Sequence, residues 1–156
     1  MVIYLQSFFS EPMGYPFSVS RFQPKGYKYL ILDFLQPYTL KRTPIKNVSP
    51  EEYKRLYCNV LALKSGTIRE WLKERVISGK DITLCCWCNE ERQRNYERLF
   101  CHTILIGYFI ESLAEIDSLD IKVEFLDGRD KPVWSREEYR DMMREIFKGR
   151  KDKNES

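Results

Sequence analysis

Residues 82–88 form a short run of apolar and β-compatible side chains between a glycine-containing helix-stop signal and a polar segment. A run this short without polar alternation predicts a central strand that is covered on both faces. Because strand side chains alternate, Cys86 and Cys88 are expected on one face and Cys85 on the other.

Helical spacing of apolar residues begins shortly after Cys101 and His102. The recurring positions are Ile104, Leu105, Tyr108, Phe109 and Leu113. Backbone N–H groups at a helix start lack partners, and the helix dipole is positive there, so a thiolate or a bound anion is favoured. The charged excursion 89–100 between strand and helix is interpreted as a solvated helical turn or as a lid.

Three capping boxes predict the starts of further helices, at Ser49–Glu52, Thr67–Glu70 and Ser135–Glu138. Strands are predicted over 2–9 and 27–35, with an alternating edge strand over 120–126, and the proline-rich segment 11–16 is expected to break the first. The alternation of strands and helices predicts an α/β fold, a single three-layer domain with a mostly parallel sheet of about four strands flanked by helices. The domain is expected over 1–147, and 148–156 is predicted to be a disordered basic tail.

Composition is that of an ordinary globular chain, with 43% hydrophobic and 31% charged residues among 156. The net charge of +3 permits contact with nucleic acid without requiring it. No apolar run approaches the roughly 20 residues that span a bilayer, and the first residues do not resemble a signal peptide. We therefore expect an intracellular, cytoplasmic protein with no membrane partner, whose five cysteines stay reduced.

Four motifs follow one another along the chain: Ser20-Arg21 followed by Pro24, the Pro50-Glu51-Glu52-Tyr53 helix start, the Leu84–Cys88 strand end and the Cys101-His102 step. Together they resemble the domain-of-unknown-function family numbered 488. The resemblance covers roughly residues 18 to 113. Most members have Arg after the Cys-His pair, where this chain has Thr103, and the 89–100 insert is longer than in short members. The family has no agreed activity, so the resemblance implies a fold and a site location, with Ser20 and Arg21 at the end of an early strand.

Three interpretations of the cysteine-rich centre stay open. Cys86, Cys88, Cys101 and His102 supply the four ligands of a structural zinc site, although their spacing matches no standard zinc finger. Alternatively, Cys101 is a catalytic nucleophile or redox thiol, with His102 as acid, base or anion binder and Cys88 or Cys86 as partner thiol. In the third interpretation the cysteines are small core residues and His102 caps its helix.

Two functions follow from these interpretations. The first is a small enzyme that acts on a phosphate-bearing substrate, a nucleotide or nucleic acid, with Ser20 and Arg21 binding the anionic group. The second is a non-enzymatic module that binds nucleic acid or another partner, with or without a structural zinc.

Overall fold

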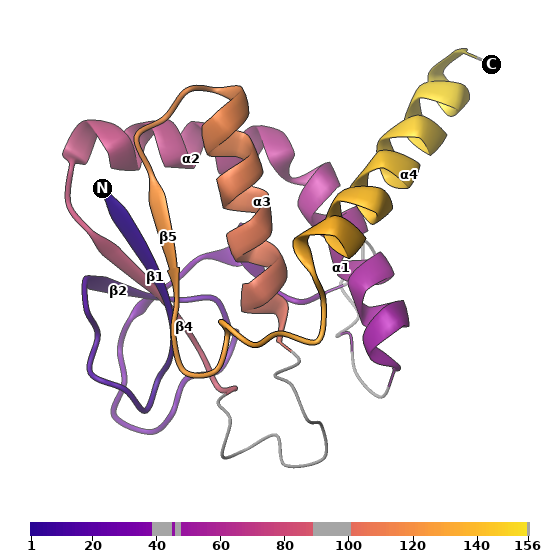
Figure 1. The fold of residues 1–156 in the computed structure, drawn as a ribbon. Helices are drawn as coiled ribbons and strands as arrows, with labels where there is room; N and C mark the ends of the chain where they lie inside the picture. The colour runs from indigo at the N-terminus through magenta and orange to yellow at the C-terminus, as the bar shows by residue number, and fades with distance from the viewer. Residues whose placement is uncertain (39–44, 46–47, 89–100, 156) are drawn as a thin grey trace.

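The computed structural model describes residues 1–38, 45, 48–88 and 101–155, and over these ranges helices pack against one parallel sheet (Figure 1). Its strands are β1 Val2–Ser7, β2 Tyr15–Ser18, β3 Leu30–Ile31, β4 Ile82–Cys86 and β5 Lys122–Phe125. They follow the order β3-β2-β4-β1-β5, and every neighbouring pair is parallel. The carboxyl ends of the strands therefore lie at one end of the sheet.

The strand β4 lies in the middle of the sheet, between β2 and β1, and all of its residues are buried. Ile82, Leu84 and Cys86 belong to the main hydrophobic core, and Thr83 and Cys85 alternate to the opposite face. The apolar run therefore predicted this central strand correctly. The edge strand β5 is half-exposed, as its alternating pattern predicted.

Two of the helices begin with the capping interactions that the sequence predicted. Their bounds are α1 Pro50–Leu63, α2 Ser65–Ser78, α3 His102–Ile116 and α4 Arg136–Glu155, with a 3₁₀ turn, η1, at Asp33–Leu35. At α1, the Ser49 side chain accepts a hydrogen bond from the Glu52 backbone N–H, which confirms the first capping box. At α4, Ser135 and Glu138 bond reciprocally, which confirms the third.

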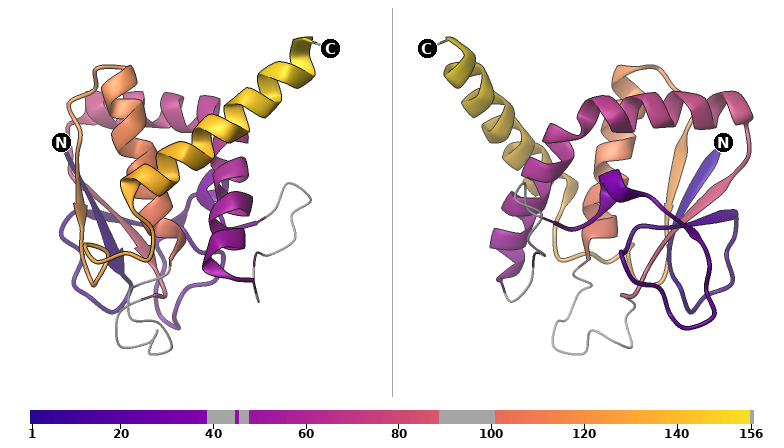
Figure 2. Two further views of the ribbon diagram at one scale, coloured as in Figure 1. Left: turned by 45° about the vertical axis from the view of Figure 1, so that its right-hand side comes forward. Right: turned by 180° about the vertical axis from the view of Figure 1, so that it is seen from behind.

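The helices α1, α2 and α3 cover one face of the sheet, and their buried side chains form one core with the inward residues of β1 and β4. On the opposite face, the Gln6 side chain bonds the backbone of Glu11 and Met13, and Thr83 accepts a hydrogen bond from the Gly14 N–H. The irregular segment 8–14 therefore crosses that face. The helix α4 packs on α1 and α3, and its C-terminal end projects from the body (Figure 2).

The predicted α/β class and parallel sheet are confirmed, with five described strands where about four were expected. The strand that the sequence did not predict is β2, which begins inside the proline-rich segment 11–16 that was expected to break the first strand. Pro16 is tolerated there because the β2–β3 pairing begins only at Phe17. The predicted strand over 27–35 shortens to β3 and η1, since the Gln23 side chain bonds both backbone groups of Tyr29.

Two further boundaries differ from the sequence prediction. The helix α2 begins at Ser65, directly after Lys64, so the Thr67 capping box does not mark its start. The helix α4 continues to Glu155, over residues for which a disordered tail is predicted, and its lysines and arginines have good helix propensity. The excursion 89–100 lies outside the described residues. None of the helices in the described ranges has the length and apolar character needed to cross a membrane.

Candidate metal and thiol centre

Three cysteine side chains from two distant segments meet at the carboxyl end of β4. Cys86 ends β4, Cys88 follows two positions later, and Cys101 immediately precedes α3. Their sulfur atoms all lie within 4.8 Å of one another. Cys86 and Cys101 are buried and Cys88 is half-buried, so the cluster approaches the surface on the Cys88 side.

The backbone fixes the two ends of this cluster independently. Cys86 pairs with Ser7 in the β1–β4 ladder, and its carbonyl accepts a hydrogen bond from the Phe8 N–H at 2.9 Å. Cys101 has an extended backbone and occupies the N-cap position of α3. The Sγ atoms of Cys86 and Cys101 are 3.2 Å apart. A central strand and a helix start thus deliver two thiols to contact distance.

Arg129 is the charged residue of this centre, and it is 1% exposed. Its Nη2 donates to Cys86 Sγ at 2.7 Å and to the Cys88 carbonyl at 2.8 Å. Its Nε donates to Thr103 Oγ1 at 2.7 Å, and Nη1 donates to the Leu126 carbonyl at 3.2 Å. The guanidinium is therefore held rigidly against the thiols.

Sequence reasoning did not select Arg129, although one signal was available. It lies in the turn after β5, and residues that follow parallel strands gather at the ligand-binding end of an α/β sheet. Thr103 accepts a hydrogen bond from Arg129 and donates one to Cys101 Sγ at 3.2 Å. The hydroxyl thus connects the guanidinium to the second buried thiol.

The electrostatics of the cluster favour one thiolate. Burial alone would raise the pKa of Cys101, but hydrogen bonds with Cys86 and Cys88, the charge of Arg129 and the Thr103 hydroxyl outweigh it and hold the pKa well below its ordinary value. Hydrogen bonds to Cys101 and Cys86, together with burial, raise the pKa of Cys88. Burial would lower the pKa of Arg129, but the charges of Cys86 and Cys101 raise it.

His102 lies beside the thiols but is directed elsewhere. Its Nε2 is 2.9 Å from the Val19 carbonyl, which can only accept, so this nitrogen carries the ring proton. Its Nδ1 then remains an acceptor 3.8 Å from Cys101 Sγ. Burial lowers the pKa of His102, which keeps the imidazole neutral. It is not among the three described residues whose ligand atoms cluster.

The remaining predicted residues lie at the edge of the centre or away from it. Ser20 and Arg21 follow Val19 at the carboxyl end of β2, and the exposed Arg21 guanidinium lies 5.6 Å from the ring centre of Phe22. Cys85 faces the opposite side of the sheet, and burial raises its pKa to about 12. The guanidinium that contacts the thiols is that of Arg129.

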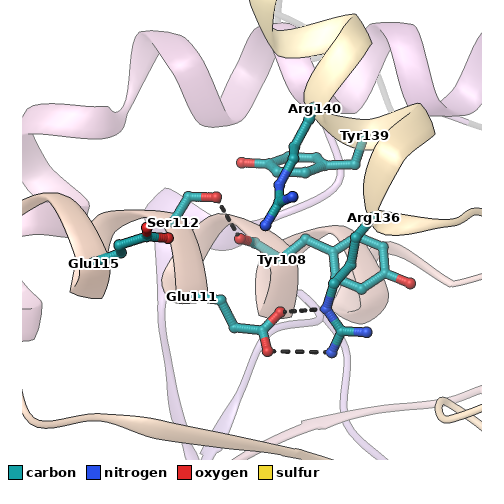
Figure 3. A pocket seen from close by; sticks show the side chains of 7 residues that line it. All are labelled: Tyr108, Glu111, Ser112, Glu115, Arg136, Tyr139 and Arg140. Atoms are coloured by element: carbon teal, nitrogen blue, oxygen red, sulfur yellow. Dashed lines mark hydrogen bonds and ion pairs between the residues drawn. The ribbon is translucent and has the colours of Figure 1, made fainter.

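A surface hollow of about 200 Å³ lies between α3 and α4, away from the thiol cluster (Figure 3). Arg136 on α4 donates two hydrogen bonds to Glu111 on α3 across this hollow, at 3.0 and 3.2 Å. Its guanidinium also lies over the Tyr108 ring. Arg136, Glu111 and Tyr108 are therefore engaged with one another, and we assign the chemistry to the buried thiols rather than to this hollow.

The comparisons with known proteins found no relative. No family model, no curated protein and no solved structure matches the chain.

Proposed function

We propose that this protein binds a thiophilic divalent metal ion, zinc, through the sulfur atoms of Cys86, Cys88 and Cys101. The observation that carries the proposal is the convergence of all three sulfur atoms within 4.8 Å. A disulfide requires two thiols, whereas a metal ion uses every member of such a group. Cysteine thiolates are the soft ligands that zinc prefers in proteins.

The spacing suits such an ion. Sulfur atoms bound tetrahedrally to zinc at about 2.3 Å lie about 3.8 Å from one another. The Cys86–Cys101 separation of 3.2 Å is below that value and the whole group lies within 4.8 Å, so shifts of less than about 1 Å bring the sulfurs into place. Cys86 is fixed by its pairing with Ser7 of β1 and by the hydrogen bond from the Phe8 N–H to its carbonyl, so Cys88 and the first turn of α3 make the adjustment.

The charges also suit a divalent ion. Three thiolates and one divalent cation leave a single negative charge, which the buried Arg129 guanidinium neutralises. Its hydrogen bond to Cys86 is the kind of outer contact that orients a metal ligand. Three protein ligands leave a fourth position for an exogenous group, as in catalytic rather than structural zinc sites. The half-buried side of Cys88 is where such a group reaches the ion.

Cobalt substitution tests the proposal. The reduced protein, freed of metal with a chelator, is titrated with Co²⁺, and the near-ultraviolet sulfur-to-cobalt transition reports the number of thiolate ligands. We expect one ion per chain with three thiolate bonds. Cys86→Ser should remove one bond, while its neighbour Cys85→Ser, on the opposite face, serves as the matched control. No transition, or equal effects of the two variants, would refute the proposal.

Thiol redox chemistry is the second candidate, favoured by the 3.2 Å contact of Cys86 and Cys101. With hydrogen peroxide, the Cys101 thiolate attacks one oxygen, becomes a sulfenic acid and releases hydroxide, which is protonated to water. The Cys86 thiol then attacks that sulfur, a disulfide forms and a second water leaves. The two sulfurs supply the two electrons that reduce the peroxide.

The two candidates are separated by one pair of reactions. Metal-free and zinc-loaded protein are treated with limiting peroxide, and disulfides are mapped by mass spectrometry. Fast formation of a Cys86–Cys101 disulfide in both samples would favour redox function. Protection by zinc would favour metal binding, because bound thiolates are unavailable for attack.

A further inference from the structure

A cluster of aromatic rings surrounds the carboxyl ends of β1, β2 and β4, beside the thiol centre. We call it the aromatic rim, and its members are Phe8, Phe9, Phe22, Tyr27, Tyr29 and Trp87. Phe8 is buried and contacts three of the other rings, with centroids 5.7 to 6.1 Å apart. It forms the floor of the rim.

Two phenylalanines of the rim are directed toward solvent. Phe22 is 71% exposed and Phe9 is 48% exposed. Surface exposure of large apolar rings is unfavourable in water, and a grouped set at the ligand-binding end of a sheet indicates a binding surface. Both residues contact Trp87, whose ring lies 6.0 Å from the Phe9 ring and whose indole N–H donates to the Phe22 carbonyl at 2.6 Å.

Hydrogen bonds hold the rim in place. The Tyr27 hydroxyl donates to the Phe8 carbonyl at 2.9 Å. The Gln23 side chain bonds both the N–H and the carbonyl of Tyr29, at 2.8 and 2.6 Å. A surface ordered in this way loses little conformational freedom when it binds a partner.

Positive charge accompanies the exposed rings. Arg21, Lys25 and Lys28 are exposed, and none of them makes an ion pair within the part of the chain that the structure describes. Over residues 8–29 these three cations face a single acid, Glu11. The nearby Asp127 carboxylate is engaged by Ser7 and Ser10.

We infer that the aromatic rim binds single-stranded nucleic acid. Bases stack on the exposed faces of Phe22 and Phe9, and phosphates contact Arg21, Lys25 and Lys28. Stacking requires unpaired bases, so single strands are preferred to a duplex. The inference is independent of the metal proposal, because no thiol takes part.

Fluorescence anisotropy with labelled oligo-dT and oligo-rU of about 12 nucleotides tests it. Three phosphate contacts on a single strand give a slope of log K against log salt of about −2.1, so raising salt from about 50 to about 200 mM weakens binding about 18-fold. Lys28→Glu should reduce the slope to about −1.4. Lys73→Glu, on the exposed face of α2, changes the net charge equally and should leave the slope unchanged.

The stacking component is measured separately. Phe22→Ala should weaken binding about 5- to 150-fold, the range found when a base loses its aromatic partner. Phe147→Ala removes a ring that is 47% exposed on α4 and should have no effect. Phe22 is mostly exposed, so its removal leaves the fold intact, which circular dichroism verifies.

Four results would overturn the inference. They are absence of binding at low salt, equal affinity for duplex DNA, equal losses from Phe22→Ala and Phe147→Ala, and Phe22-dependent binding to phosphatidylserine-containing vesicles in place of oligonucleotides. Comparing oligo-dT with oligo-rU shows which sugar the aromatic rim accepts. Binding of either oligonucleotide supports the inference.

Discussion

Removal of the Arg129 guanidinium should destabilise the protein more than any single surface charge does. Arg129→Met keeps an unbranched, flexible side chain but removes donors to Cys86, Thr103 and the Cys88 carbonyl. It also leaves the Cys101 thiolate buried without a cation. Breaking a buried pair from one side typically costs about 3–5 kcal/mol, and we expect a loss of that size in the metal-free protein at neutral pH.

Urea unfolding under reducing conditions with a chelator measures this loss. Arg69→Met is the matched control, because it removes an arginine from a more exposed pair with Asp117 and should change stability far less. A double-mutant cycle identifies the cause. In a Cys101→Ala background no thiolate is left without a counter-charge. Arg129→Met should therefore lower the free energy of unfolding by about 0.5–3 kcal/mol less than it does in the original protein.

Two results would contradict this reasoning. If Arg129→Met destabilised the protein no more than Arg69→Met, the guanidinium would not be the counter-charge of the centre. If the effects of the Arg129 and Cys101 substitutions on the free energy of unfolding were additive, the Cys101 thiolate would not be the partner of the Arg129 guanidinium.

Three other predictions follow from the same structure. Zinc binding at pH 7 should release protons, because the raised pKa of Cys88 keeps that thiol protonated until the ion replaces its proton, and calorimetry in buffers of different ionisation enthalpy counts them. Burial raises the pKa of Cys58 from 9.0 to about 12, so above pH 9 the folded state holds a proton that the unfolded state releases. Cys58 should by itself lower the free energy of unfolding by about 1.4 kcal/mol between pH 7 and 10, and urea unfolding of Cys58→Ala should lack this contribution. Gly14→Ala places a Cβ 2.7 Å from the Asp81 backbone and should destabilise by about 1–3 kcal/mol in thermal unfolding, whereas Gly66→Ala, with nothing within 4 Å, should not.

The sequence pattern predicted the elements whose causes are local. The buried run gave β4, and the capping boxes at Ser49 and Ser135 gave α1 and α4, because side chains three positions apart decide whether a helix can begin. The proximity of the β4 end and the Cys101 step was also predicted, since parallel topology places strand ends next to following helix starts.

The parts that were missed depend on tertiary contacts. A charged residue such as Arg129, between Gly128 and Asp130, has the composition of a solvated turn, and only the fold places it against thiols. Likewise β2 contains Pro16, which disfavours a strand wherever a neighbour needs the missing N–H. Neither case is decided by residues close in sequence.

The position of β1 in the sheet has a consequence for how the chain folds. Its partners lie 79 and 120 positions later, on the two strands that flank it, so its backbone groups remain unpaired until most of the polypeptide exists. Pairings between strands far apart in sequence slow folding and prolong the lifetime of aggregation-prone intermediates. Refolding yield should therefore fall steeply as protein concentration rises, because β1 stays exposed to other chains until both of its partner strands are in place.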